Sequence, residues 1–301
     1  MVRLVHDVSR FVLTLCLLLA AVRPTSALTE GEIQKFIDEA IKAGGGEVAI
    51  PPGIHVIEKG LRLTNAKKLR LIGLDAEESV LKAGKEAPTL LLIGGSCEEV
   101  RIEKLTFESG RDAVAENPDA AAGNHFSKML IGRCFFQNQT HSGIRLPKAA
   151  MEGLEIDGCS FRDIGGDAVH LGRQVSNSQV THNHFTRCQT GVKLAGSQKC
   201  LVASNELSDC ETGILIEGPD DNASVDQVNI IAINAIERTS QNAVVIQSGT
   251  QNNAVIQNEI HDSKGDGIRL SGNKHVVKAN QITGSGGKNV VVVEGTHEIA
   301  Q

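Results

Sequence analysis

The 301-residue sequence contains no tryptophan and no tyrosine, so its only large aromatic side chains are eight phenylalanines. Sites for neutral sugars commonly use tryptophan or tyrosine as stacking platforms, because these rings offer a large contact area with a polar edge. Half of the phenylalanines, Phe107, Phe136, Phe161 and Phe185, fall on an apolar position of a repeat described below, where we expect them to be buried. The composition therefore disfavours a neutral-sugar site, and we expect any glycan ligand to be anionic and held by charged side chains.

A long hydrophobic run is also missing. The longest apolar stretch, residues 11–22, has twelve residues, fewer than the roughly 20 that span a bilayer. Arg3 and Arg10 precede it and Thr-Ser-Ala follows at 25–27. Residues 1–27 thus have the basic start, apolar core and small-residue cleavage site of a signal peptide. This predicts a secreted or periplasmic protein with one mature domain, residues 28–301; an uncleaved N-terminal anchor is the alternative.

The sequence has no excess of positive charge. Its 30 Lys and Arg face 36 Asp and Glu, which gives a net charge of −6 and a pI near 5.9. A nucleic-acid partner would require a basic surface to neutralise phosphates, and no stretch resembles a basic amphipathic helix of the kind that binds membrane surfaces. We therefore expect no nucleic-acid partner, no membrane partner after signal cleavage, and a monomer.

One motif recurs along most of the chain. In its clearest copy an apolar residue, Val180, is followed by Asn183, Phe185 and the sequence GVKL at 191–194. The residues at the Asn position lie 22 to 29 residues apart: Leu105, Cys134, Cys159, Asn183, Asn205, Asn234, Asn258 and Asn280. A period of about 20–50 residues is typical of a solenoid, in which each unit buries its apolar face on its neighbours.

Within each copy apolar and polar residues alternate over short runs, which is the period of a β-strand. We therefore predict about eight or nine coils of short strands, each stacked about 4.8 Å from the next. The recurring Asn is expected to adopt left-handed geometry at a bend, with its amide bonded to the coils on either side. The Gly or Ala before the third strand is expected to allow a tight turn.

The N-terminal part of the mature chain contains the one clear helix, residues 28–43. Thr29 and Glu32 form a capping-box pattern before an apolar stripe, and three glycines at 44–46 end the helix. The coils are expected from about residue 45 to 295. Residues 116–128 and 217–227 are rich in turn-forming residues and are predicted to be loops.

The repeated Asn-x-Phe/Ile, the later Gly-Ile-x-Leu and the sequence GGGEVAIPPG at 44–53 resemble the pectate-lyase-like superfamily. The resemblance implies an all-β fold, a single-stranded right-handed parallel β-helix with three sheets, whose open end is covered by an N-terminal capping α-helix. It covers about residues 45–295 and is specific for fold. It does not specify activity, because this scaffold carries lyases, hydrolases, epimerases, adhesins and non-catalytic proteins.

Six cysteines follow the signal peptide. Aligning the copies places Cys188 directly over Cys210, within the Cα separation that a disulfide accepts, and we predict that they pair. Cys134 and Cys159 also stack, but as small buried residues they need not be bonded; the pairing of the remaining cysteines is open. No Cys-x-x-Cys or His-rich spacing indicates zinc. We therefore predict neither a metal site nor another cofactor.

The middle residue of each Gly-Ile-x-Leu segment is expected to point outward. In three successive copies this residue is Arg145, His170 and Lys193, about 4.8 Å apart. A uronate lyase or epimerase needs a cation to neutralise the carboxylate and a base to remove the α-proton. Arg145 or Lys193 would supply the cation and His170 the base, with Asp167 close enough to contact the imidazole.

Substrate-binding residues are expected beside these three side chains. In the pectate-lyase-like families this sheet and its flanking turns form the substrate groove, which here implicates His141 in a turn and Asn124 and His125 in the loop. Arg269 lies four copies after His170 and is expected to be dispensable for chemistry.

The sequence also departs from the enzymes it resembles. Calcium-dependent pectate lyases cluster acids on neighbouring coils, whereas Asp167 and Asp266 are four copies apart; calcium is left open without a clustered acidic site. The paired aspartates of polygalacturonases and the Asp-Pro-His-Asp of mannuronan epimerases are missing. Two functions remain. The first is a lyase or epimerase of an acidic, uronic-acid-containing polysaccharide, with hydrolysis less favoured. The second is a non-catalytic carbohydrate-binding or surface scaffold, in which the outward polar residues simply meet water.

Overall fold

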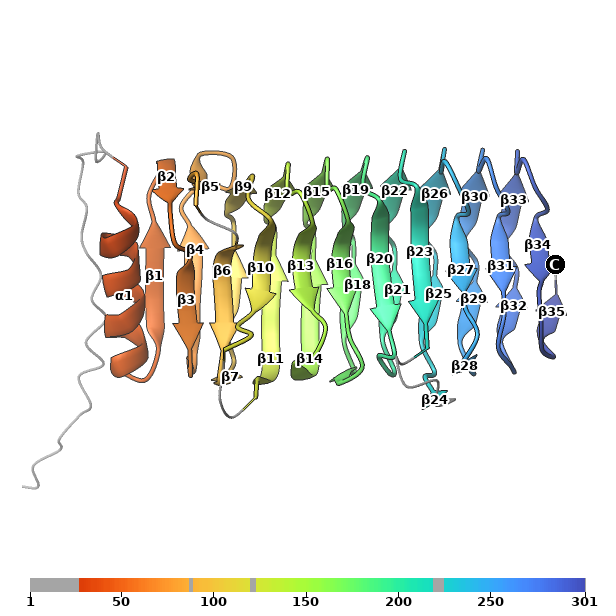
Figure 1. Cartoon of the computed structure of the whole chain (residues 1–301), viewed down its shortest axis with the longest axis horizontal. Coiled ribbons are helices and arrows are strands. Elements are labelled where there is room, and N and C mark those ends of the chain that lie inside the picture. Colours follow the sequence, from red (N-terminus) through yellow and green to blue (C-terminus); the bar gives the residue numbers. More distant parts are fainter. Residues whose placement is uncertain (1–26, 87–88, 120–122, 219–224, 301) are drawn as a thin grey trace, which may run out of the picture.

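A computed structural model describes residues 27–86, 89–119, 123–218 and 225–300. It contains one helix, α1 (Glu30–Lys42), followed by a right-handed parallel β-helix (Figure 1). The predicted fold class is confirmed. The signal peptide predicted for residues 1–27 lies almost wholly outside the described residues. No helix within these ranges is long and apolar enough to cross a membrane.

Three sheets run the length of the solenoid, and every pairing between neighbouring coils is parallel. Sheet A contains β1 (Gly46–Ile50), β4 (Leu69–Gly73), β8 (Arg101–Glu103), β11 (His125–Gly132), β14 (Ala150–Asp157), β18 (Gln179–Thr181), β21 (Leu201–Ala203), β25 (Ile230–Ala232), β29 (Ala254–Ile256), β32 (Val276–Lys278) and β35 (Glu298–Ala300), with β7 (Ser96–Glu98) and β17 (Val175–Ser176) beside this path. Sheet B contains β2 (Gly53–Ile57), β5 (Ser79–Ala83), β9 (Thr106–Glu108), β12 (Phe135–Gln137), β15 (Ser160–Arg162), β19 (His184–Thr186), β22 (Glu206–Ser208), β26 (Ala235–Glu237), β30 (Glu259–His261) and β33 (Gln281–Thr283).

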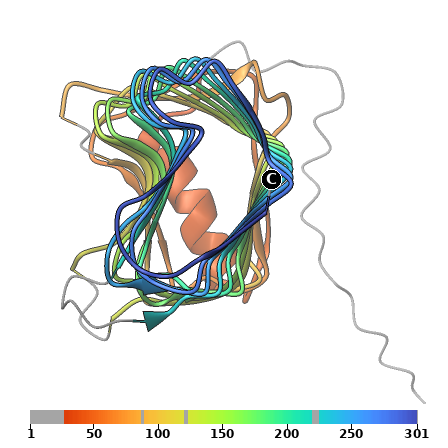
Figure 2. The same cartoon turned by 90° about the vertical axis from the view of Figure 1, so that its right-hand side faces the viewer.

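Sheet C contains β3 (Leu61–Thr64), β6 (Thr89–Gly94), β10 (Asp112–Glu116), β13 (Ser142–Leu146), β16 (Asp167–Leu171), β20 (Thr190–Ala195), β23 (Thr212–Glu217), β27 (Val244–Ile246), β31 (Ile268–Leu270) and β34 (Val290–Val292). A small pair, β24 (Val225–Asp226) with β28 (Thr250–Gln251), lies between sheets C and A. Each coil visits sheets A, B and C in turn (Figure 2). Sheets B and C have ten strands each, so there are ten coils rather than the eight or nine expected.

The two predicted loops are shorter than expected. Strand β10 extends to Glu116 and β11 begins at His125, which leaves 117–124 as the connection. Strand β23 extends to Glu217, and β24 lies within the second segment. The sequence-based bounds were wrong because both strands continue past the apolar residues that mark the motif.

Each coil has three corners, and these differ in how much their length varies from coil to coil. In the third and later coils five residues separate the inward residue of sheet A from that of sheet B, as from Ile131 to Phe136 and from Val277 to Ile282, whereas in the second coil Leu71 and Leu81 are ten residues apart. The corner from sheet C to sheet A varies most, and it also carries β7, β17, β24 and β28. Variation in the repeat length therefore arises mainly at this one corner.

Helix α1 covers the open end of the first coil, as the view along the solenoid shows (Figure 2). The capping box is present, with the Thr29 side chain accepting from the Glu32 amide. Ile33 and Ile37 are fully buried against the first strands. The cap removes the apolar end of the core from water, which an open solenoid would leave exposed.

The core of sheet B is a stack of parallel phenylalanine rings. Phe107, Phe136, Phe161 and Phe185 follow one another at centroid distances of 4.6–5.1 Å. This stack explains the recurring Gly or Ala. A Cβ on Gly143 would lie 2.8 Å from the Phe161 ring and 2.6 Å from the Ala168 carbonyl. Lack of space within the core, rather than the tight turn that we expected, excludes larger residues there.

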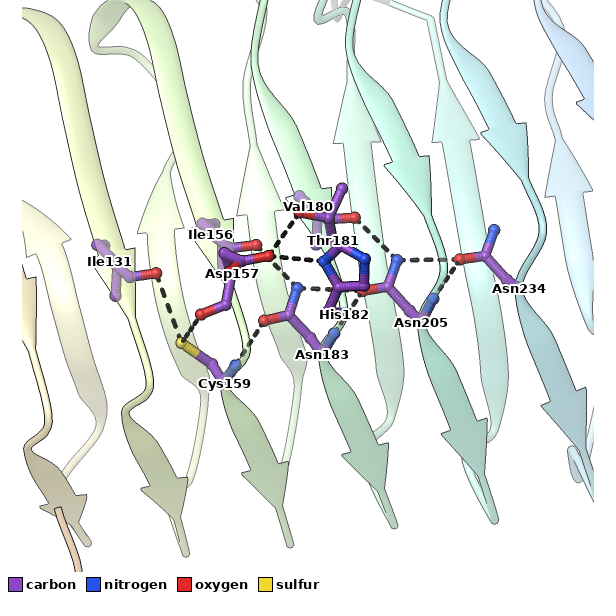
Figure 3. Close-up of polar contacts among 10 residues, drawn as sticks. All are labelled: Ile131, Ile156, Asp157, Cys159, Val180, Thr181, His182, Asn183, Asn205 and Asn234. Carbon is purple, nitrogen blue, oxygen red and sulfur yellow. Dashed lines mark hydrogen bonds and ion pairs between the residues drawn. The ribbon is translucent and has the colours of Figure 1, made fainter.

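The recurring asparagines lie in one internal line at the corner between sheets A and B (Figure 3). The backbone and side-chain N–H groups of Asn183 both donate to Oδ1 of Asn205, at 2.9 and 3.1 Å. Asn205 donates in the same way to Asn234, Asn234 to Asn258 and Asn258 to Asn280. Each Nδ2 also reaches back to a carbonyl of the preceding coil, as Asn234 does to Val202 at 2.9 Å.

Left-handed geometry does not fall on the asparagines themselves, contrary to our expectation. It falls on the residue before each of them: His182, Ser204, Ile233, Gln257 and Ala279 have φ between 53° and 57°. That residue points outward while the asparagine points inward. The amide is thus selected for its internal hydrogen bonds and not for its backbone preference.

A second internal column, which the sequence did not reveal, lies at the corner that leads into sheet A. The Cys200 amide donates to Asn229 Oδ1, the Asn229 amide to Asn253 Oδ1, and the Asn253 amide to Nδ1 of His275. The His275 amide donates in turn to Nδ1 of His297, and the two rings stack. The residue types change along this column, which is why no single letter repeats.

Replacing Asn234 by Leu should destabilise the protein by about 1–3 kcal/mol, because buried groups on two neighbouring coils lose their partners. The donors of Asn205 lose Oδ1 as their acceptor, and the Val202 carbonyl loses its donor. Urea unfolding measures the change. Gln281→Leu, at an exposed position one residue after Asn280, is the control and should cost less than about 0.5 kcal/mol.

The stability of the protein should fall in mild acid through His275. Burial lowers the pKa of His275 from 6.5 to about 4, so the unfolded chain gains a proton that the folded chain excludes. The contribution of His275 to the free energy of unfolding is therefore fully present above pH 6.5. It decreases toward pH 4 by about 1.4 kcal/mol for each pH unit. His275→Asn supplies the amide oxygen that Asn229 and Asn253 use and should reduce the slope, measured by urea unfolding at several pH values. An unchanged slope would contradict the assignment; exposed His125→Asn is the control.

Candidate functional site

Sheet C brings together the three outward residues that the repeat predicted. Arg145 on β13 pairs in register with His170 on β16, and His170 pairs with Lys193 on β20. The residues that alternate with them along the strands, such as Ile144 and Val169, point inward and are fully buried. We call Arg145, His170 and Lys193, with the acids Asp112, Glu116, Asp167 and Glu217, the charged cluster.

Asp167 contacts His170 as expected. Its Oδ2 atom lies 3.1 Å from Nδ1 of His170, and the side chains are only 20% and 14% exposed. Burial alone would raise the pKa of Asp167. The hydrogen bond from His170 and the charges of His170 and Lys193 outweigh this effect and hold the pKa below its usual value. The carboxylate thus remains ionised and engages Nδ1, which leaves Nε2 to exchange a proton with a ligand.

Burial distinguishes this pair from another Asp–His pair on the surface. His182 Nδ1 lies 2.8 Å from Asp157 Oδ1 (Figure 3), but these side chains are 68% and 47% exposed. An ion pair in that setting is screened by water and contributes little. The short distance alone is therefore no sign of function; the half-buried position of His170 between two cations is the distinguishing feature.

The two flanking cations differ in their partners. Lys193 Nζ lies 2.8 Å from Oε2 of Glu217 on the next coil. Arg145 forms no ion pair with a described residue, and its buried Nε has no hydrogen-bond partner there. Elsewhere, Arg187 makes two bonds to the carboxylate of Asp163. Arg145 is thus the cation best able to bind the carboxylate of a ligand.

Three acids of the charged cluster were missed in the sequence. Asp112 is buried and accepts from Nδ1 of His141 at 2.8 Å. Burial raises the pKa of Glu116, and hydrogen bonds from the Lys148 and Ala149 amides and the charge of Arg145 offset this only in part. Asp112 could have been found, because it precedes Ala113 as Asp167 precedes Ala168. Glu116 and Glu217 extend strands beyond the motif and carried no such signal.

The expected substrate-binding residues do not converge. His141 lies just before β13, at the same end of the strands as Asp167. Asn124 and His125 follow the opposite ends of the sheet C strands, and His125 begins β11 in sheet A. The Asn124 amide also has backbone partners, since it accepts from Gly95 and donates to Asn117. It serves to hold the connection, so its assignment to substrate is not supported by its contacts.

The described part of the chain contains no group of three or more His, Cys, Asp or Glu that could hold a metal ion. Two shallow hollows lie along α1, lined by Gln34, Asp38 and Lys42 among others, and not at the charged cluster. At the charged cluster, the side chains of Asp167, His170, Lys193 and Glu217 are 14–26% exposed.

The six described cysteines are buried free thiols. A hydrogen bond with Cys210 and burial hold the pKa of Cys188 well above its usual value, so the thiol is not predisposed to react. The disulfide between Cys188 and Cys210 stays a prediction.

Removing the imidazole of His170 should raise the pKa of Asp167, because burial then acts without its main opposing contact. NMR titration of the side-chain carboxyl carbons in protein labelled with ¹³C aspartate would measure this pKa in wild type and in His170→Ala. His182→Ala is the matched control: it should raise the pKa of Asp157, which His182 helps to lower, and leave Asp167 unchanged. A similar pKa for Asp167 in wild type and His170→Ala would contradict the contact.

Comparisons with known proteins agree with this architecture. No curated protein matches the sequence. Among solved structures, the chain is similar to the A-module of the mannuronan C-5 epimerase AlgE4 of Azotobacter vinelandii, with 16% identity and a TM-score of 0.65 over 90% of this chain and 91% of that chain. It is also similar to the catalytic domain of a GH87 α-1,3-glucanase, with 11% identity and a TM-score of 0.62 over 93% and 69% of the two chains. A third is DFA-IIIase of Arthrobacter chlorophenolicus A6, with 13% identity and a TM-score of 0.59 over 93% and 92%.

Identities this low show a shared fold and not a shared activity. A family model for the right-handed β-helix region matches residues 119–283, which is more than half of the chain. These residues include the charged cluster from Arg145 to Glu217, the asparagine column from Asn183 to Asn280 and the second column as far as His275. The chain belongs to the right-handed β-helix family.

Proposed function

We propose that this protein is an extracytoplasmic enzyme that acts on an acidic, uronic-acid-containing polysaccharide by β-elimination or C5-epimerisation. The observation that carries the proposal is the stacking of Arg145, His170 and Lys193 in one column, with Asp167 on Nδ1 of His170. A cation without an ion-pair partner thus lies one strand from a half-buried imidazole.

The chemistry follows from these positions. The Arg145 guanidinium would bind the uronate carboxylate and disperse the charge that develops when the neighbouring α-proton leaves. The proton would move to Nε2 of His170, and Asp167 would stabilise the imidazolium that forms. In elimination the electron pair forms a carbon–carbon double bond and expels the oxygen at C4; in epimerisation a proton returns to the opposite face of the same carbon. Lys193, already paired with Glu217, would orient the next sugar unit.

Two further observations support this class of ligand. One structural neighbour is named for mannuronan, a polymer of uronic acid; others are named for an α-1,3-glucanase and a complex with GF2, which support a carbohydrate ligand in general but not an acidic one. The lack of Trp and Tyr favours recognition through charge. The export that the proposal requires rests on the signal-peptide pattern of residues 1–27.

A non-catalytic carbohydrate-binding scaffold is the second candidate. Ion pairs within the chain already engage His170 and Lys193, which favours this candidate, because outward charged residues on a sheet commonly serve only to meet water. A scaffold would bind the polysaccharide without changing it.

Incubation of the purified protein with pectate, alginate, chondroitin and heparin-like chains tests the proposal. Ultraviolet absorbance of an unsaturated uronate reports elimination, and proton exchange followed by NMR in D₂O reports epimerisation. His170→Ala should lower the rate by about 10²–10⁴-fold, because it removes the base. Arg145→Ala should also cripple turnover, since the carboxylate would be left without its cation.

Arg269→Ala is the control. Arg269 pairs with Asp266 at 3.1 Å in the arrangement seen for His170 and Asp167, but it lies four strands away, about 19 Å at the usual strand spacing. It should leave the rate unchanged. Equal rates in all three variants would contradict the assignment of the cluster. Binding of a polyanion without turnover, reduced in Arg145→Ala, would support the scaffold instead.

A further inference from the structure

The outer face of sheet A changes from charged to apolar along the solenoid. The outward residues of its earlier strands are mostly charged or polar: Arg70, Arg101, Glu103, Glu155, Asp157, Gln179 and Thr181, whereas Ala49, Ile72 and Leu130 are apolar. From β21 onward most of them are apolar: Leu201, Ala203, Ile230, Ala232, Ala254, Ile256 and Val276. We call these seven residues, with Val228 and Ile233, the apolar face.

Strand β25 lies at the centre of the apolar face and is apolar across its whole outward width. Val228 and Ile233 occupy the two bends that flank it and have φ of 53° and 57°. Left-handed geometry is unfavourable for β-branched residues. The equivalent bends of the neighbouring coils carry Lys199, Ser204, Asn252 and Gln257.

The side chains of Val228 and Ile233 at these strained bends, and that of Ile230 between them, do not pack into the core. Val228, Ile230 and Ile233 are 42%, 40% and 59% exposed. The fold therefore accepts unfavourable backbone geometry at two positions to present apolar side chains to the outside. Strain without a packing benefit indicates an interaction with something outside the chain.

We propose that the apolar face packs against the same face of a second copy of this chain, about a two-fold axis that runs close to β25. This arrangement differs from the monomer that the composition led us to expect. It places β25 over its own equivalent, β21 over β29, and β18 over β32.

The side chains are complementary in size under this axis. Leu201 on β21 faces Ala254 on β29, and Ala203 on β21 faces Ile256 on β29. Large residues thus oppose small ones on both sides of the axis, while the Ile230 side chains of the two copies meet at its centre. Such interdigitation is how the inner faces of two packed sheets fill the space between them.

The charges at the edges are complementary as well. Lys274 and Lys278 at β32 of one copy lie over β18 of the other, next to β14 with Glu152 and Glu155. Long lysine side chains can span the one-strand offset of about 4.8 Å. Glu298 on β35 would lie over Glu155 at the outermost edge, where both exposed side chains can turn into water.

The size of the apolar face sets the expected strength. It covers roughly 400–500 Å² for each copy, from strand spacing and rise, whereas a stable interface buries about 800 Å² for each partner. We therefore expect a reversible dimer, with a dissociation constant on the order of 10 μM.

Sedimentation equilibrium of the purified protein from about 1 to 500 μM tests the proposal. The weight-average mass of wild type should approach twice that of the monomer. Ile230→Arg should raise the dissociation constant at least about tenfold, because each dimer contains the change twice at its centre. Ile54→Arg, at an exposed isoleucine of sheet B, is the matched control and should dimerise as wild type does.

Ile233→Asn separates association from folding. It should weaken the dimer, yet raise the thermal midpoint of dilute monomer by about 2–4 °C, because Asn tolerates the left-handed bend. A wild type that stays monomeric at 500 μM would overturn the proposal, as would Ile230→Arg associating as tightly as wild type. Monomeric protein that binds phosphatidylcholine vesicles through Ile230 would assign the face to lipid instead. None of these outcomes depends on catalytic activity.

Discussion

The structure depends on hydrogen bonds that internal side chains make from coil to coil. Backbone pairing between parallel strands repeats every two residues and does not by itself exclude a slipped register. The side-chain amide of Asn234 removes this freedom, because it bonds to Asn205 and to the Val202 carbonyl on the coil before and to Asn258 on the coil after. The column through Asn229, Asn253 and His275 does the same at the other end of sheet A. A slip would leave buried polar groups unpaired in both columns at once.

This fixed register is what assembles the charged cluster. Arg145, His170 and Lys193 are more than 20 residues apart along the chain, yet they meet because each occupies the same place in its coil. The three side chains differ in their ion-pair partners. Carboxylates hold His170 and Lys193 in place, whereas Arg145 keeps its charge available. In the proposed function, the cluster would therefore bind an anion through one specific side chain and not through a general positive field.

Much of the fold could be predicted because the sequence repeats one motif. Eight copies of one motif specify strands, stacking and the outward column that contains His170. The parts that could not be predicted follow from interactions that change residue type from coil to coil. His275 replaces an asparagine in the second column, and only its contacts reveal the equivalence. The sequence did indicate the contact of Asp167 with His170, but Glu217 reaches Lys193 from an adjacent coil, beyond the repeated segment.

In the third and later coils, the constant length of the corner between sheets A and B also restricts how this protein can change. An added residue there would move an asparagine out of its column, whereas the corner from sheet C to sheet A already varies and carries accessory strands. Within the coils that carry the asparagine column, new segments can thus enter at little cost mainly along that second corner. This corner borders both the sheet with the charged cluster and the sheet with the apolar face. A loop that is inserted during evolution or by design to deepen the surface of one of these sheets must therefore start at the corner that both sheets share.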